Sequence, residues 1–155
     1  LRHGAHLTPS RRNSMQRQVV DMAYTTYLIK AGGTEIPLSY IFTNTYDVTP
    51  NQRLETSAER NTSGVLSRVT VSHTPSKVEF DTRPLYEADK NALMAIITGA
   101  YTDTNARQLT LDYYCPDTGS YQTGTFYVPD IKFTILSVIN NNPLYDKIRI
   151  AFIEY

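Results

Sequence analysis

The chain has one cysteine, no tryptophan, no net charge and no long apolar segment, and each shortage excludes a class of protein. Because Cys115 is the only cysteine among 155 residues, no intrachain disulfide can form, and the composition is typical of a protein made in a reducing cytoplasm. No apolar run approaches the roughly 20 residues needed to cross a bilayer, so no membrane partner is expected. A chain of this length forms one domain by default and can bury a hydrophobic core without disulfides.

Charge is balanced over the whole chain but unevenly distributed. Residues 1–21 contain one acid, Asp21, and four arginines: Arg2, Arg11, Arg12 and Arg17. The remaining residues contain 11 basic and 14 acidic side chains, a net charge of −3. A surface that binds nucleic-acid phosphates needs a basic face, so this mildly acidic part predicts no specific nucleic-acid binding.

The same contrast places a boundary near residue 22. Residues 1–21 are rich in Arg, Ser and Gln and have no apolar periodicity, and Met22 precedes the first strand-like run. We interpret residues 1–21 as a disordered or non-native leader, with a basic arm that orders on a partner as the alternative. Residues 22–155 are then expected to form a single β-sandwich domain, with an extended arm at residues 49–68.

Most of this domain has the pattern of short β-strands separated by turn residues. Strands are predicted at residues 25–31, 35–46, 68–72, 77–81, 108–114, 121–128, 132–139 and 148–155. One helix is predicted at residues 86–98, where Pro84 fits the first turn and Gly99 the end. The fold class is therefore mainly β (α+β): a β-sandwich or open barrel of about eight or nine short strands, with one flanking helix and a long arm.

The arm at residues 49–68 is the most distinctive segment. It is too polar to form a core, and Gly64 permits a hairpin reversal. We predict that it contacts a neighbouring copy of the chain, whereas a solvated loop is the alternative. The candidate contact residues carry charges of both signs or lie where the arm returns: Gln52, Arg53, Glu55, Glu59, Arg60, Val65, Leu66 and Arg68.

One motif resembles a catalytic sequence. Asp117-Thr-Gly-Ser120 matches the catalytic loop of aspartic proteases, which need two aspartates facing each other. A single copy would serve only in a homodimer, which is a remote alternative. Pro116 precedes Asp117 and tyrosine-rich strands flank both, a composition typical of a hairpin turn.

No other group of residues predicts an enzyme, a cofactor or a metal site. His3, His6 and His73 do not have metal-ligand spacing, Cys115 is interpreted as a free structural thiol, and the carboxylates are scattered. The 12 tyrosines leave one competing function open, a monomeric carbohydrate- or surface-binding β-sandwich module, although tryptophan is absent.

The order of these elements resembles small tail structural proteins of bacteriophages and prophages, of the tail-tube or distal-tail type. The features that carry the resemblance are the polar arm with Gly64, the segments 73–80 and 86–98, the hairpin 113–121 and the closing segment 149–155. Together they span residues 24–155.

The resemblance implies a function and partners. Proteins of this type have a β-sandwich with a flanking helix and assemble as rings, commonly hexameric, in which long loops reach onto adjacent subunits. It therefore implies a non-enzymatic virion protein of the tail tube, tip or connector, made in the bacterial host cytoplasm. Its partners would be copies of itself, in a hexameric ring, and other phage tail proteins.

Overall fold

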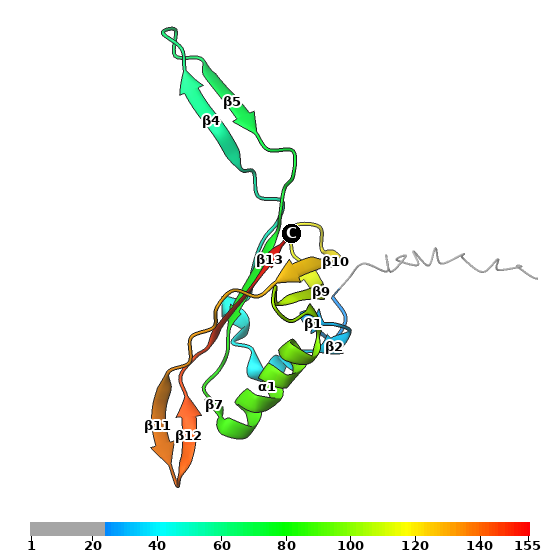
Figure 1. Ribbon diagram of the computed structural model, residues 1–155, viewed down its shortest axis with the longest axis vertical. Helices are drawn as coiled ribbons and strands as arrows, with labels where there is room; N and C mark the ends of the chain where they lie inside the picture. The colour runs from blue at the N-terminus through cyan, green and yellow to red at the C-terminus, as the bar shows by residue number, and fades with distance from the viewer. Residues whose placement is uncertain (1–23) are drawn as a thin grey trace, which may run out of the picture.

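Figure 1 shows the computed structural model of the chain, which describes residues 24–155. The predicted leader, residues 1–21, lies outside the described residues. Thirteen antiparallel strands, one α-helix and two 3-10 helices make up the described part. The prediction of a mainly β fold with one helix and an extended hairpin is confirmed. The number of strands exceeds the prediction because several of them are only two or three residues long.

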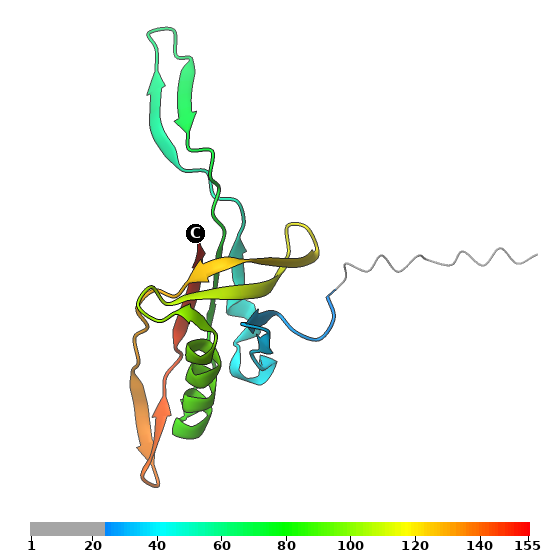
Figure 2. The same cartoon turned by 45° about the vertical axis from the view of Figure 1, so that its right-hand side comes forward.

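The main sheet has eight strands in the order β2-β1-β9-β10-β13-β6-β3, with β8 also paired to β9. Their bounds are β1 (Ile29–Ala31), β2 (Thr34–Glu35), β3 (Asp47–Thr49), β6 (Lys77–Asp81), β8 (Tyr101–Asp103), β9 (Gln108–Cys115), β10 (Ser120–Tyr127) and β13 (Arg149–Glu154). β10 pairs with β13 through only two residues, Phe126 and Tyr127. The sheet bends at this short junction, so that β9 and β10 cross the direction of β13 (Figure 2).

The bend brings the two ends of the sheet together. The hydroxyl of Tyr46, which precedes β3, donates hydrogen bonds to the backbone oxygens of Tyr114 in β9 (2.9 Å) and of Leu28 just before β1 (3.3 Å). Burial raises the pKa of the Tyr46 hydroxyl, which accords with its position inside the curled sheet. Tyr46 thus links strands from opposite ends of the sheet order, as in an open barrel.

Helix α1 (Glu87–Gly99) covers part of the core. Leu93 and Ile97 are fully buried, and the acidic residues Glu87 and Asp89 lie in the first turn, where the helix dipole favours them. A short strand, β7 (Leu85–Tyr86), separates Pro84 from the helix, so Pro84 does not occupy the first turn as predicted. The other core side chains alternate along their strands as predicted: Val78 and Phe80; Leu109, Leu111 and Tyr113; Ile148, Ile150 and Phe152.

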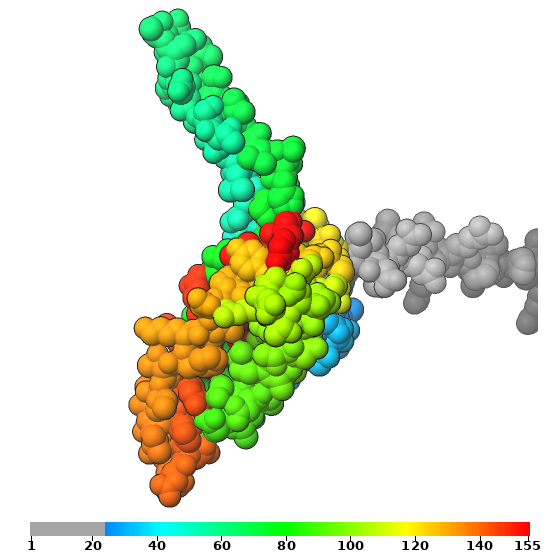
Figure 3. All heavy atoms as spheres, in the orientation of Figure 1, coloured from blue at the N-terminus to red at the C-terminus, as the bar shows by residue number. Residues whose placement is uncertain are grey.

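Two hairpins project away from this core. The first consists of β4 (Glu55–Arg60) and β5 (Leu66–Thr70), which form a sheet of their own. The second consists of β11 (Ile135–Ile139) and β12 (Asn142–Tyr145), and β12 also pairs with β7. Figures 1 and 3 show that the two hairpins extend from opposite ends of the molecule.

One strand prediction was wrong in part. Residues 35–46 were predicted as one strand, but β2 ends at Glu35 and two 3-10 helices follow, Leu38–Tyr40 and Thr43–Thr45. Pro37 has no N–H for a strand ladder, and the buried side chains are Ile36 and Ile41, five residues apart rather than an even number. Between the predicted strands 132–139 and 148–155, the chain makes a tight turn at Asn140 and Asn141, after which β12 begins.

Candidate assembly surfaces

The predicted arm is a well-defined β-hairpin. Every residue of β4 and β5 is exposed, so neither strand contributes to the core. The two strands pair from Arg60–Leu66 at the tip to Glu55–Thr70 near the base, with a bulge beside Thr56. The reversal occurs near Gly64, which has a positive φ of 79°, as the sequence predicted.

Side chains at the tip order the turn locally. The carboxamide oxygen of Asn61 accepts hydrogen bonds from the backbone N–H groups of Ser63 (3.0 Å) and Val65 (2.9 Å). The guanidinium of Arg60 donates to the backbone oxygen of Gly64 (2.8 Å). The turn therefore has a preferred conformation even though no core residue touches it, which favours a defined projection over a solvated loop.

The arm carries aliphatic side chains on both of its faces. The register places Val69 opposite Ser57, and Val65, Ser67 and Val69 alternate onto that same face of β5. Leu66 lies on the other face, opposite Arg60. All three aliphatic residues are exposed: Val65 by 61%, Val69 by 54% and Leu66 by 44%.

The charged residues of the arm are partly paired with one another. Arg68 forms an ion pair with Glu55 across the hairpin, and both lie on the same face as Leu66. No ion pair of Arg53 or Glu59 is formed with residues in the described range 24–155. The charges of both signs, on which the sequence prediction rested, are therefore in part paired within the arm itself.

The base of the arm is attached by a few backbone hydrogen bonds. The N–H of Gln52 donates to the oxygen of Pro75 (2.9 Å), and the N–H of Asn51 donates to the hydroxyl of Ser76 (3.2 Å). The last bond within the hairpin joins the N–H of Val71 to the oxygen of Leu54 (2.8 Å). Gln52 is thus an anchoring residue, whereas the other candidate residues lie beyond it.

The second hairpin exposes a surface that was not predicted from the sequence. Every residue of β11 is exposed, and β11 is the outer strand of the sheet β11-β12-β7. Its apolar side chains are Ile135 (55% exposed), Leu136 (55%), Val138 (60%) and Ile139 (42%). The sequence feature that could have indicated this surface is the absence of any charged residue from segment 133–145.

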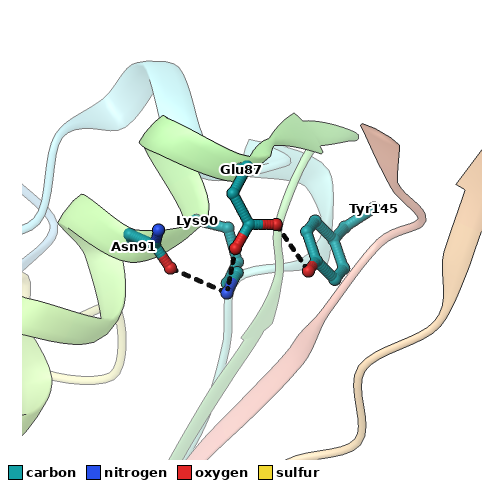
Figure 4. Close-up of polar contacts among 4 residues, drawn as sticks. All are labelled: Glu87, Lys90, Asn91 and Tyr145. Atoms are coloured by element: carbon teal, nitrogen blue, oxygen red, sulfur yellow. Dashed lines mark hydrogen bonds and ion pairs between the residues drawn. The ribbon is translucent and has the colours of Figure 1, made fainter. Parts of the chain in front are cut away.

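A polar cluster fixes the base of the second hairpin to α1 (Figure 4). The hydroxyl of Tyr145 donates to a carboxylate oxygen of Glu87 (2.7 Å), and the ammonium of Lys90 donates to the other oxygen (3.2 Å) and to Asn91 (2.7 Å). These bonds, first that from Tyr145 and then that from Lys90, lower the pKa of Glu87. Lys90 also lies over the rings of Tyr145 (4.9 Å) and Phe133 (5.8 Å).

Two residues of the protease-like motif, Asp117 and Thr118, line a polar cavity of about 400 Å³ at the base of the arm. Asp117 is in the exposed turn between β9 and β10, as predicted for a hairpin turn. His73 is exposed and Cys115 is 2% exposed, and both also line the cavity. Their common location was not predicted, because they are far apart in the sequence. A thiol so enclosed by core residues is poorly placed to attack a substrate.

The tyrosine-rich surface is largely self-contained. Tyr27 stacks on Tyr121 (ring centroids 4.4 Å apart), and Tyr114 contacts Tyr24 and Tyr121 edge to face. The hydroxyl of Tyr121 donates to the backbone oxygen of Tyr27 (2.8 Å) and accepts the N–H of Thr25 (2.9 Å). These ring contacts attach the segment before β1 to the β9–β10 hairpin.

The sequence places the chain in a family that covers all of the described residues. A model of a family of unknown function, DUF6711, matches residues 22–155. The chain belongs to DUF6711. No curated protein sequence matches this DUF6711 member. One similar solved structure is a chain from the tail of an empty GTA particle, computed with helical refinement and C6 symmetry. It shares 13% sequence identity and a TM-score of 0.49, and the match covers 84% of this chain and 91% of that chain.

This DUF6711 protein has neither a metal-ligand cluster nor a membrane-spanning helix among its described residues. Within residues 24–155, no three His, Cys, Asp or Glu side chains are grouped so that they could hold a metal ion. In the same range, no helix has the length and apolar character needed to span a membrane.

Proposed function

We propose that this protein is a non-enzymatic structural protein of a bacteriophage or prophage tail, which self-assembles into a ring through the arm β4–β5. The observation that carries this proposal is a hairpin in which every strand residue is exposed, including aliphatic residues on both faces. A two-stranded hairpin alone is marginally stable in water, and exposed apolar patches are typical of interaction sites. A neighbouring subunit would supply the surface that the arm lacks.

The tail and the hexameric ring are proposed from the sequence resemblance described above. The net charge of −3 for residues 22–155 is compatible with this role, because a ring lined by acidic side chains repels DNA phosphates and lets a genome pass. The proposed location is the virion tail, as a tube, tip or connector component, with other tail proteins as further partners. Repetition of one contact around a ring gives a stable assembly without catalysis.

The two alternatives have less support. A carbohydrate-binding face would present free aromatic rings, but Tyr27 stacks on Tyr121 and Tyr114 contacts Tyr121 edge to face. A homodimeric protease would need Asp117 at a dimer axis beneath a substrate groove, but Asp117 lies in an exposed turn at the rim of a polar cavity.

The test is to replace residues 55–70 by Asn-Gly in the full chain. Leu54 and Val71 already form a hydrogen-bonded pair, and Asn-Gly is the preferred two-residue turn for such a pair. The rest of the chain outside the arm, which we call the body, should therefore keep its fold. Native mass spectrometry over a concentration series should show a ring-sized oligomer for the parent chain and a monomer for the variant. Circular dichroism and thermal unfolding should show that the variant remains folded.

Two results would contradict the proposal in different ways. If the shortened variant still forms the same oligomer, the arm is not the assembly element. If the parent chain is monomeric at every concentration, self-assembly itself is excluded, and saccharide-dependent tyrosine fluorescence would then test the binding-module alternative.

A further inference from the structure

The exposed aliphatic side chains are concentrated in two places. Among residues 24–155, nine Leu, Ile and Val side chains are exposed, and all of them lie on the two hairpins or at the base of the arm. The first group is Leu54, Val65, Leu66, Val69 and Val71, and the second is Ile135, Leu136, Val138 and Ile139. Single exposed apolar residues are common on protein surfaces, but two separate groups with none between them are not expected by chance.

Strand β11 lacks the usual protection of an edge strand. Its outer edge is unpaired, and it contains no charged residue and no proline. One bulge, beside Leu136, is the only feature in it that disfavours pairing with another strand. An exposed apolar edge of this kind readily pairs with a strand of another chain.

The distribution of side chains on β11 favours a partner that adds to its edge. Ile135 is opposite Tyr145, which faces α1, whereas Ile139 is opposite Asn142 on the other face of the sheet. A protein packed on one face would leave the aliphatic residues of the other face in water. A strand added at the edge places side chains beside both faces at once.

Strand β5 of the arm has the properties expected of a partner strand for β11. β5 and β11 are each five residues long, both have an unpaired outer edge, and both carry aliphatic side chains on the two faces. Because β11 has no charge, its partner gains nothing from ion pairs, which suits a strand whose own Arg68 is already paired with Glu55. The two hairpins lie at opposite ends of the molecule, so they cannot meet within one chain (Figure 1).

We therefore propose that the outer edge of β5 in one copy pairs with the outer edge of β11 in the next copy. The result is an intermolecular sheet in the order β4-β5-β11-β12-β7, in which both exposed aliphatic groups are buried by one contact. This inference rests on the proposed function and adds to it the surface that receives the arm. The contact is head-to-tail, so it closes into a ring or continues as a filament and does not stop at a twofold dimer.

The chain is well suited to a cross-linking test, because its only natural thiol, Cys115, is buried. We would prepare two variants of the whole chain, Ser67→Cys at the second residue of β5 and Ser137→Cys in the middle of β11, both at exposed positions. The variants are mixed in equal amounts, allowed to assemble and treated with a short bis-maleimide. Adjacent strands place cross-strand Cβ atoms about 5 Å apart, within reach of this reagent.

The expected result is a covalent dimer in the mixture and little in either variant alone. A mixture of Ser67→Cys with Asp117→Cys, which lies in the exposed turn of the body, serves as the control and should remain uncross-linked. Dimers from Ser137→Cys alone would indicate β11 pairing with itself, and dimers from Ser67→Cys alone would indicate arm-to-arm contact. Arm-to-arm dimers, or an assembled sample without the mixed dimer, overturn the inference and leave the proposed function standing. Pairing of β11 with itself overturns the inference and also contradicts assembly through the arm.

A second variant tests the edge without a cross-linker. Val138→Lys places a charge on β11 at a position that is 60% exposed, so the fold should be unaffected. The concentration needed for half-assembly should rise at least about tenfold, with an unchanged melting temperature. Assembly at the parental concentration would overturn the inference. A parent chain that never assembles would instead overturn the proposed function and the inference together.

Discussion

Replacing the two most exposed valines of the arm tests whether its aliphatic side chains hold neighbouring subunits. Val65 is 61% exposed and Val69 is 54% exposed in the single chain. Each Val→Ala change removes two methyl groups, worth about 0.8 kcal/mol each when fully buried, so burial of the remaining exposed half contributes about 1 kcal/mol per valine. The double variant should therefore weaken each subunit contact by about 2 kcal/mol, or roughly 30-fold in dissociation constant.

The matched control is Ser67→Ala with Thr70→Ala, on the same strand. These changes also place alanine at exposed β-strand positions, but they remove much less apolar surface. We expect the control to change the dissociation constant by less than about threefold, and neither variant to move the melting temperature of the monomer, because β5 makes no core contact. Sedimentation velocity over a concentration series measures both constants. If both variants weaken the subunit contact equally, or if neither weakens it, the argument from burial is refuted.

The remaining predictions concern the fold that carries the hairpins. Tyr46→Phe removes the donor to the oxygens of Tyr114 and Leu28, so the free energy of unfolding in urea should fall by about 1–2 kcal/mol. Burial raises the pKa of Tyr46 above 10.0. The contribution of Tyr46 to the free energy of unfolding is therefore complete below pH 10 and decreases as pH rises toward the folded pKa. Alkaline destabilisation should be smaller in Tyr46→Phe than in the parent chain. Tyr145→Phe removes the bond to Glu87, and hydrogen exchange should accelerate in β11 and β12 while it stays unchanged in β6.

The strands that the sequence predicted best are those with one face in the core. β6 was predicted with its observed bounds, and the buried residues of β9 and β13 follow the predicted alternation. These segments have polar residues between apolar ones, so a period of two is visible in the sequence itself. The helix was predicted to within one residue at each end, because acidic residues mark its start and Gly99 its end.

The errors arose where side-chain contacts override local pattern. Residues 35–46 alternate like a strand, but Pro37 interrupts the ladder and the chain turns twice so that both Ile36 and Ile41 reach the core. No strand was predicted at residues 140–147, where three asparagines, Asn140 to Asn142, stand in a row. Asn140 and Asn141 both have positive φ, the conformation of a tight hairpin turn, so that the strand partner of β11 begins immediately afterwards.

The two candidate surfaces differ in how far they were predictable. The arm was found because a polar segment of that length cannot be core. The run of apolar residues in β11 reads like any buried strand, since periodicity does not show whether the covering surface belongs to the same chain or to another. Only the burial of each residue distinguishes the two cases, and for β11 it shows every residue exposed.

The separation of the core from the hairpins allows folding of the chain to precede its assembly. Ile148, Ile150, Phe152 and the other buried residues all belong to the body, so the body can fold before any contact with another copy. The arm has no such support, because every residue of its two strands is exposed, and a neighbour that covers it as proposed would stabilise it. In the proposed ring, each contact would be weak in isolation, and closure, in which every arm is covered at once, would stabilise all of them together. On this proposal, the subunit is a monomer at low concentration and assembles cooperatively once a first pair has formed.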